Sequence, residues 1–291
     1  MNQTILLKSR KYPKLLKEIK YPPDTLYIRG NITPGIFTNC LAVVGSRMMS
    51  PYGKKALERI FENINRDITI VSGFMYGVDA WAHTLALQNG MRTIAVLAGG
   101  VDCIVPPTHK RLYEQILENK GLIISEYDGN IAPLKWSYPK RNRIVAGLSK
   151  AALIAEAALH SGSLITAELS HKFGRKVFTI PGSIFSRYSR GCLYLLNSYG
   201  EGVYSAGSIN SFYNLPDYVG INQRSPNSID ANSLGDSTLG TKLVEYLKNT
   251  PSSIDELLPV LRVSTQELNK AVTLEILSGN IMENGGRYYA Y

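Results

Sequence analysis

Loops of glycine and serine follow four short apolar segments of this chain, and their residue types suggest anion chemistry. Gly45, Ser46 and Arg47 follow one segment, and Ser72 and Gly73 end the next. Small residues let backbone N–H groups approach an anion, and an arginine adds a bidentate donor. Two later loops have a similar composition: Ala98-Gly99-Gly100, and His160-Ser161-Gly162-Ser163 with Thr166 one turn further on. One such loop is common in α/β folds, whereas four together indicate an anion site.

A second segment places aromatic rings beside cations, in the order Trp136-Ser137-Tyr138-Pro139-Lys140-Arg141-Asn142-Arg143. Rings that stack on bases, next to cations that hold phosphates, are what single-stranded nucleic-acid binding requires. The same residues also fit a solvated helix start with a ring packed inward. The segment alone leaves both interpretations open.

The sequence patterns of the common nucleotide-binding enzymes are absent. No GxGxxG follows an apolar segment and no GxxxxGK[ST] occurs, so we expect no dinucleotide or other cofactor. Ser161 and Ser163 have no GxSxG context, and the four histidines have no HExxH spacing. Asp79, Asp102 and Glu156 follow predicted strands and are acid–base candidates, but capping helices or orienting arginines is the interpretation that we favour.

Alternating apolar and helical patterns predict the scaffold. Short apolar segments, typical of parallel strands buried on both faces, cover residues 41–45, 68–72, 93–98, 122–125, 151–155 and 176–180. Helical patterns lie between them at residues 51–65, 78–89, 109–119, roughly 143–148 and 163–173. This alternation predicts an extended Rossmann-like α/β fold with a doubly wound, mostly parallel sheet, in which the strand-end loops meet at one edge.

The remaining segments suggest four parts. Residues 1–40 are a leader that we expect to pack on the core, without a helix through Pro22-Pro23. Residues 41–215 form the Rossmann-like domain, and residues 216–237, rich in Pro, Asn, Ser, Gly and Asp, read as a flexible linker.

Residues 238–291 predict a small winged-helix domain. Helical patterns cover 241–248, 253–261 and 264–278, the last with Ser264 and Glu267 placed as a capping box. Two short strands joined at Asn284-Gly285-Gly286 complete the pattern.

Charge is distributed unevenly along the chain. The net charge of +9 favours polyanionic partners. Residues 238–291 contain five Lys and Arg against six Asp and Glu, so their net charge is −1. The rest of the chain therefore carries a net charge of +10. We therefore expect the polyanion site to lie outside the C-terminal segment.

Composition also bears on compartment and metal binding. The three cysteines are far apart and odd in number, so neither a disulfide framework nor a metal site is expected. No apolar run reaches the ~18–20 residues of a membrane span, and the N-terminus lacks a signal-peptide core. We expect a cytoplasmic protein.

The motifs resemble those of the DprA/Smf (DNA-processing protein A) family over nearly the whole chain. Gly45-Ser46-Arg47 matches its GSR motif, and Ser72–His83 resembles its SGxAxGID…AH stretch. Tyr138–Ser149 resembles FPxRNRIIAGLS, and Glu156–Gly182 is similar to EA…SGSLITA…A…GRxVFAVPG. The last two stretches are long, gapless and specific.

The resemblance implies a non-enzymatic homodimer that binds and protects single-stranded DNA and helps to load RecA in natural transformation or recombination. The DNA or phosphate contacts that it implies are Gly45, Ser46, Arg47, Ser72, Gly73, Lys140, Arg141, Asn142, Arg143, Ser161, Gly162, Ser163 and Thr166. Lys172, Arg175 and Lys176 are secondary candidates, because they could lie on the far side of the sheet.

The chain departs from the family pattern in three places. Met75 stands where the family has Ala, and Ala98 replaces the first Gly of GxG, with Ile104-Val105-Pro106 replacing VYP. Residues 191–196 lack the family's Asn, in a region that lies near its dimer contacts.

Two other functions stay open at this point. Nucleoside-monophosphate phosphoribohydrolases share the fold class, but their PGGxGTxxE is absent and SGSLITAE, Ser161–Glu168, occupies the similar place. A winged-helix regulator of duplex DNA is the other alternative, against which the −1 charge of the C-terminal segment speaks.

Overall fold

The computed structural model describes residues 2–218 and 239–290, which belong to two compact units. Each unit has its own hydrophobic core. In these residues no helix is long and apolar enough to span a bilayer.

Six parallel strands form the centre of the first unit. They are β3 (Cys40–Val44), β4 (Thr69–Ser72), β5 (Thr93–Val96), β6 (Leu122–Ser125), β7 (Ala151–Ile154) and β8 (Lys176–Thr179), in the spatial order β6-β5-β4-β3-β7-β8. Nearly every residue in them is buried, because helices cover both faces of the sheet. The predicted Rossmann-like, mostly parallel α/β fold is confirmed.

The order of the strands reverses at β3, which has β4 on one side and β7 on the other. From β3 the chain first builds outward to β6 and then returns to start β7. Ligands of open α/β sheets bind at the carboxyl ends of the strands beside such a switch point. The topology therefore fixes where a site is expected.

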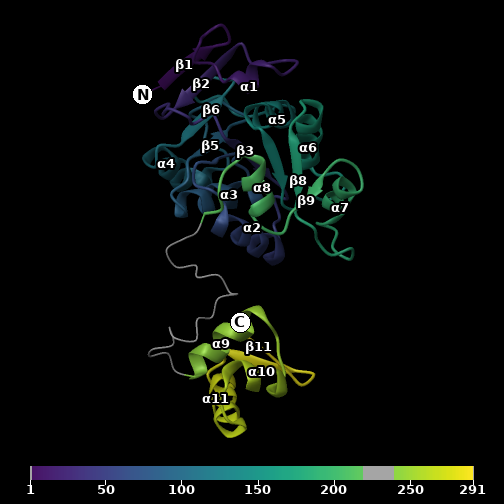
Figure 1. The fold of residues 1–291 in the computed structure, drawn as a ribbon. Helices are drawn as coiled ribbons and strands as arrows, with labels where there is room; N and C mark the ends of the chain where they lie inside the picture. The colour runs from purple at the N-terminus through teal and green to yellow at the C-terminus, as the bar shows by residue number, and fades with distance from the viewer. Residues whose placement is uncertain (1, 219–238, 291) are drawn as a thin grey trace. The chain divides into compact units, whose positions relative to one another are not determined.

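Helices form a layer on each face of the sheet (Figure 1). On one face, α1 (Lys14–Lys17), α5 (Ser137–Leu148), α6 (Gly162–Lys172) and α7 (Arg190–Leu196) pack on side chains such as Ile94 and Ile124. On the other face lie α2 (Pro51–Asn63), α3 (Val78–Gln88), α4 (Lys110–Glu118) and α8 (Gly207–Phe212), with a short 3₁₀ turn at Pro107–His109. The predicted start of α5 was wrong: the helix begins at Ser137, because Pro139 lies in its first turn, where proline is tolerated.

The leader is part of the sheet, although no strand was predicted in it. Strands β1 (Asn2–Leu6) and β2 (Thr25–Arg29) form an antiparallel ribbon, and β2 pairs antiparallel with β6 through Tyr27 and Ser125. At the other edge, the two residues of β9 (Glu201–Gly202) pair parallel with β8. Two edges that would otherwise expose unpaired backbone are thus partly covered.

The predicted linker lies mostly outside the described residues, which omit 219–237 of it. Its first three residues pack on the first unit. The Tyr218 N–H donates to the Asn63 carbonyl at 3.0 Å, and the Asn65 amide donates to the Pro216 carbonyl at 2.9 Å.

The second unit contains the predicted three helices and hairpin. They are α9 (Leu239–Asn249), α10 (Ile254–Leu261), α11 (Thr265–Leu277), β10 (Ile281–Asn284) and β11 (Arg287–Ala290). Ser264 and Glu267 form the predicted capping box at the start of α11. Gly285 and Gly286 turn the hairpin with φ of +61° and +77°, a conformation that favours glycine. Its assignment as a winged helix stays a prediction.

Candidate functional site

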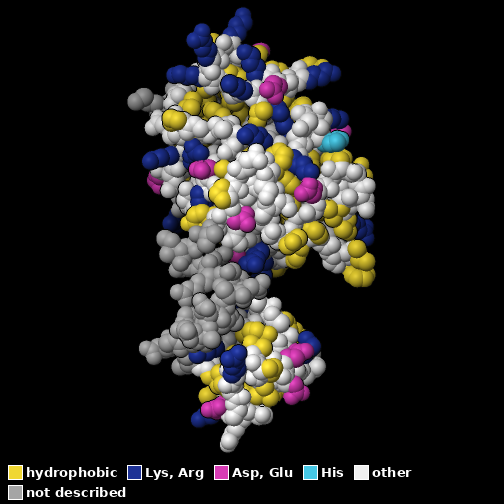
Figure 2. Space-filling model, in the orientation of Figure 1, with side chains coloured by type: hydrophobic (Ala, Val, Ile, Leu, Met, Phe, Trp, Pro, Cys, Tyr) yellow, Lys and Arg dark blue, Asp and Glu magenta, His cyan; other side chains and the backbone are white. Residues whose placement is uncertain are grey.

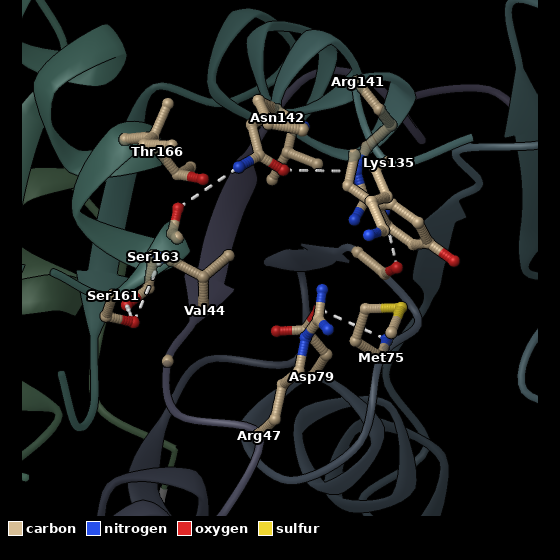
Figure 3. Close-up of a pocket in the computed structure, with 17 residues that line it drawn as sticks. Val44, Arg47, Met75, Asp79, Lys135, Arg141, Asn142, Ser161, Ser163 and Thr166 are labelled. Carbon is tan, nitrogen blue, oxygen red and sulfur yellow. Dashed lines mark hydrogen bonds between the residues drawn. The ribbon is translucent and has the colours of Figure 1, made fainter. Parts of the chain in front are cut away.

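A pocket of about 430 Å³ lies at the carboxyl ends of β3, β4 and β7, between α5 and α6 (Figure 3). Ser161, Ser163 and Thr166 form one wall, and Arg47, Met75 and Asp79 form the opposite one. Lys135, Arg141 and Asn142 close the site between them. The other lining residues are Val44, Gly45, Gly73, Tyr138, Pro139, Val145, Gly162 and Ile165.

The family resemblance implies thirteen DNA or phosphate contacts, and nine of these residues line this pocket. They are Gly45, Arg47, Gly73, Arg141, Asn142, Ser161, Gly162, Ser163 and Thr166. Four others do not line it: Ser46, Ser72, Lys140 and Arg143. Segments more than 100 residues apart in sequence thus meet at the switch point of the sheet.

Ser46 and Ser72 hold the loops around the pocket. The Ser72 hydroxyl is buried and donates to the Val43 carbonyl at 2.6 Å, which ties the ends of β3 and β4 together. The Ser46 hydroxyl accepts from the Met48 N–H at 3.1 Å, and its backbone carbonyl accepts from the Val78 N–H at 3.1 Å.

Lys140 and Arg143 are paired with the carboxylate of Glu126. Their nitrogens lie 3.2 and 2.6 Å from its oxygens. Lys140 also donates to the Tyr127 hydroxyl at 3.1 Å. This hydrogen bond and the Glu126 carboxylate raise the pKa of Lys140. Both cations therefore lie beside the pocket with part of their charge already compensated.

Arg141 is buried and points into the end of the sheet. Its Nη1 donates to the Gly73 carbonyl at 2.5 Å and to the Val96 carbonyl. Burial lowers its pKa to about 10, an effect that the carboxylate of Asp79 partly offsets. A Cβ at position 73 would lie 2.6 Å from the Arg141 guanidinium, so a larger residue there would displace this buried group.

Asp79 gives the pocket a carboxyl group. It accepts a hydrogen bond from the Met75 N–H at 3.3 Å and is 8% exposed. Burial raises its pKa to about 6, although Arg141, the Met75 amide and Arg47 all favour the ionised form. The favoured structural role is supported, since this carboxyl holds the turn before α3.

Two cations of the pocket are exposed and have no ion-pair partner in residues 2–218 and 239–290. Arg47 lies 5.5 Å from the centre of the Tyr138 ring. Lys135 lies just before α5 and also lines the pocket. It was not among the predicted contacts, and its position next to Trp136 was the only signal for it in the sequence. These two side chains supply positive charge that an anion can reach.

The start of α6 forms the second half of the anion site. Ser161 caps the helix by accepting from the Ser163 N–H at 3.3 Å, and the two hydroxyls lie 2.7 Å apart. Asn142 from α5 donates to the Gly162 carbonyl at 3.2 Å and so ties the two helices together. A Cβ on Gly162 would meet nothing within 4 Å, so this helix start is open to a ligand.

The start of α2, which follows the Gly45 loop, is not available to an anion. Glu156 is buried there and accepts from the Ser50 N–H at 2.8 Å and from the Ser50 hydroxyl at 2.5 Å. A carboxylate of the protein therefore already compensates the positive end of α2. This also assigns Glu156 the helix-capping role that the sequence favoured.

The other candidates lie elsewhere. The secondary cations lie outside the pocket and are paired with acids, namely Lys172 with Glu168, Arg175 with Glu18 and Lys176 with Glu201. Asp102 forms an ion pair with Arg29. In the described part of the chain, no group of three His, Cys, Asp or Glu could hold a metal, and the three cysteines are free and buried.

The two rings of the aromatic segment lie in different surroundings. Trp136 is 55% exposed at the start of α5, so its ring is not the inward-packed ring of the alternative interpretation. The Tyr138 ring lines the pocket beside Arg47. One ring and one cation thus meet in the pocket, an arrangement that suits a base and a phosphate.

Known proteins are similar to this chain in sequence. DNA processing protein DprA of Streptococcus pneumoniae is 45% identical over 185 residues, which cover 64% of this chain and 65% of that protein. Protein Smf of Synechocystis is 40% identical over 207 residues, which cover 68% of this chain and 50% of that protein. The chain thus matches about half to two thirds of the length of these relatives.

Solved structures agree. The S. pneumoniae DprA structure superposes with a TM-score of 0.69 at 40% identity, covering 72% of this chain and 73% of that one. DNA processing protein A of Helicobacter pylori, which has a single-stranded DNA binding mode, gives a TM-score of 0.64 at 30% identity, covering 74% and 96%. The family model for DNA recombination-mediator protein A matches residues 3–214. The chain therefore belongs to the DprA/Smf family of DNA recombination-mediator proteins.

Proposed function

We propose that this protein binds single-stranded DNA in the pocket between α5 and α6. The proposal rests on one observation: two exposed cations, Arg47 and Lys135, line the same pocket as the open start of α6. A phosphate between them would gain two positive charges and the positive end of the α6 dipole.

Single strands fit this site better than duplexes. The pocket is a concave site of about 430 Å³, the Tyr138 ring lines it, and Trp136, next to the lining residue Lys135 in sequence, is exposed. A single strand can turn an unpaired base toward Tyr138 or Trp136, whereas a duplex keeps its bases stacked inside. The H. pylori relative supports this choice, because it binds single-stranded DNA.

The test is a titration of a labelled oligonucleotide, single-stranded and then duplexed, at two salt concentrations. Arg47→Glu should weaken single-strand binding and lower the salt slope by at least about 0.7, because it removes one phosphate contact and adds repulsion. Lys110→Glu makes the same charge change on α4, on the other face of the sheet, and serves as control. Normal binding by Arg47→Glu, or a preference for duplex, would refute the proposal.

We also propose a non-catalytic role in recombination, in which the protein protects single strands, helps to load RecA and acts in the cytoplasm. Membership of a recombination-mediator family supports the process. The three acid–base candidates have structural partners: Asp79 accepts from the Met75 N–H, Glu156 accepts from the Ser50 N–H, and Asp102 pairs with Arg29. Stimulation of RecA filament assembly by the wild-type protein and not by Arg47→Glu would be the expected result, whereas release of free base from a nucleoside monophosphate would favour an enzyme.

A homodimer is the third part of the proposal. Large apolar side chains gather near α7 and β9, visible as a yellow area on the first unit (Figure 2). Ile184 and Phe185, before α7, are 69% and 90% exposed, and Tyr204, after β9, is 87% exposed. Large exposed apolar side chains that gather into a patch mark interaction surfaces. Sedimentation should show a dimer for the wild type and a monomer for Phe185→Asp; an unchanged dimer would place the interface elsewhere.

A further inference from the structure

A strongly basic surface lies on the N-terminal segment, away from the pocket lining. Its six cations, here called the N-terminal basic patch, are Lys8, Arg10, Lys11, Lys14, Lys17 and Lys20. All six are exposed, and none forms an ion pair with another described residue. Glu18, the only acid among residues 8–20, is neutralised by Arg175 at 3.1 Å. Figure 2 shows Lys and Arg side chains gathered at this end of the first unit.

The patch is joined to the pocket through α5. The Arg143 Nε donates to the Tyr21 carbonyl at 2.9 Å, which attaches the end of the basic segment to this helix. The next residue toward the N-terminus, Asn142, lines the pocket. Packing of Leu16 against Gly147 fixes α1 on the same helix. One rigid element thus connects the two sites.

An exposed ring lies beside a cation at each end of this connection. At one end, Trp136, which follows the pocket residue Lys135, lies 5.7 Å from the Lys140 ammonium. At the other end, Tyr21 is 68% exposed and lies 5.4 Å from the Lys20 ammonium. Rings that stack on bases, spaced between cations that hold phosphates, are characteristic of surfaces that follow a single strand.

We propose that the N-terminal basic patch extends the pocket into a longer track for single-stranded nucleic acid. The strand leaves the pocket past Trp136, crosses α5 near Tyr21 and places its phosphates on Lys14, Lys17 and Lys20. This inference rests on the proposed function of the pocket. A membrane surface fits less well, because α1 has only four residues and is too short for an amphipathic anchor.

The track predicts a dependence on strand length. The variant Lys14→Gln/Lys17→Gln/Lys20→Gln removes three exposed charges that have no ion-pair partner among the described residues. With an oligonucleotide of about 16 nucleotides, the salt slope of binding should fall by about 2, which is 0.7 for each of three lost phosphate contacts. A fourfold rise in salt should then shrink the affinity gap between wild type and variant by roughly 20-fold. With about 4 nucleotides, which engage only the pocket, the variant should bind like the wild type.

The matched control removes the same charge from the opposite face, as Lys110→Gln/Arg111→Gln/Lys120→Gln. Equal long-strand binding by the patch variant and the control would overturn the track, even while Arg47→Glu still weakens both oligonucleotides. No binding of either oligonucleotide by the wild type would overturn the pocket proposal and the track together. If the patch variant no longer sediments with phosphatidylserine vesicles while the wild type does, and its DNA affinity is unchanged, the patch binds a lipid surface instead.

Discussion

Replacing Asp79 with asparagine should stabilise the first unit at neutral pH. The carboxyl is 8% exposed at the start of α3, where burial raises its pKa from 3.8 to about 6. The guanidinium groups of Arg141 and Arg47 compensate its charge only in part. Asparagine keeps an acceptor for the Met75 N–H and brings no charge to bury.

The magnitude follows from the difference in pKa between the folded and unfolded states. A rise of about 2 pKa units corresponds to about 3 kcal/mol. The folded protein holds this proton more tightly than the unfolded chain, so stability falls as pH rises from about 4 to about 6 and stays lower above that range. Asp79→Asn should remove this slope and gain up to about 3 kcal/mol near pH 7.

Urea unfolding of wild type and variant between about pH 4 and pH 7 measures both quantities. Asp67→Asn changes an exposed aspartate and serves as control. The reasoning is refuted if Asp79→Asn is less stable than the wild type near pH 7, because the ionised carboxylate would then stabilise the fold. The same variant should bind single strands more tightly, since it removes a negative charge from the pocket wall.

Three further predictions concern other parts of the chain. Gly73→Ala should destabilise the first unit and weaken strand binding, because its Cβ would displace the Arg141 guanidinium; Gly162→Ala, in open space at a helix start, should leave thermal stability unchanged or slightly higher. Deleting residues 238–291 should leave single-strand affinity intact, because the first unit keeps its complete core, and a collapse of affinity would contradict the location of the pocket. Ser264→Ala should cost the second unit about 1 kcal/mol through loss of the α11 cap, seen by circular dichroism as a lower melting temperature of that unit alone.

The central sheet could be predicted because its strands are buried on both faces and read as continuous apolar runs. The N-terminal strands could not. In β2, buried Leu26 and Ile28 alternate with half-buried residues in a segment also rich in lysine and proline. A short edge strand of this kind resembles a loop in sequence. Its pairing with β6 is set by tertiary packing across roughly 90 residues of chain.

The site was predicted at the level of loops but not of side-chain directions. Consecutive residues of a helix point about 100° apart, so Lys140, Arg141 and Arg143 separate once α5 begins at Ser137. One of them turns into the sheet and two turn toward Glu126. Motif position identified these residues, but only the phase of the helix shows which cations a ligand can reach.

The ribbon of β1 and β2 has a consequence for how the protein is made. Its partner β6 begins at Leu122, so the ribbon leaves the ribosome about 90 residues before the strand that it needs. At roughly 5–20 residues per second, this delay is about 5–20 s. During that interval the ribbon has no sheet to join, and we expect the charged residues between its two strands to oppose aggregation. A nascent chain arrested before residue 122 should therefore stay accessible to proteases at its N-terminus and become protected only after β6 has emerged.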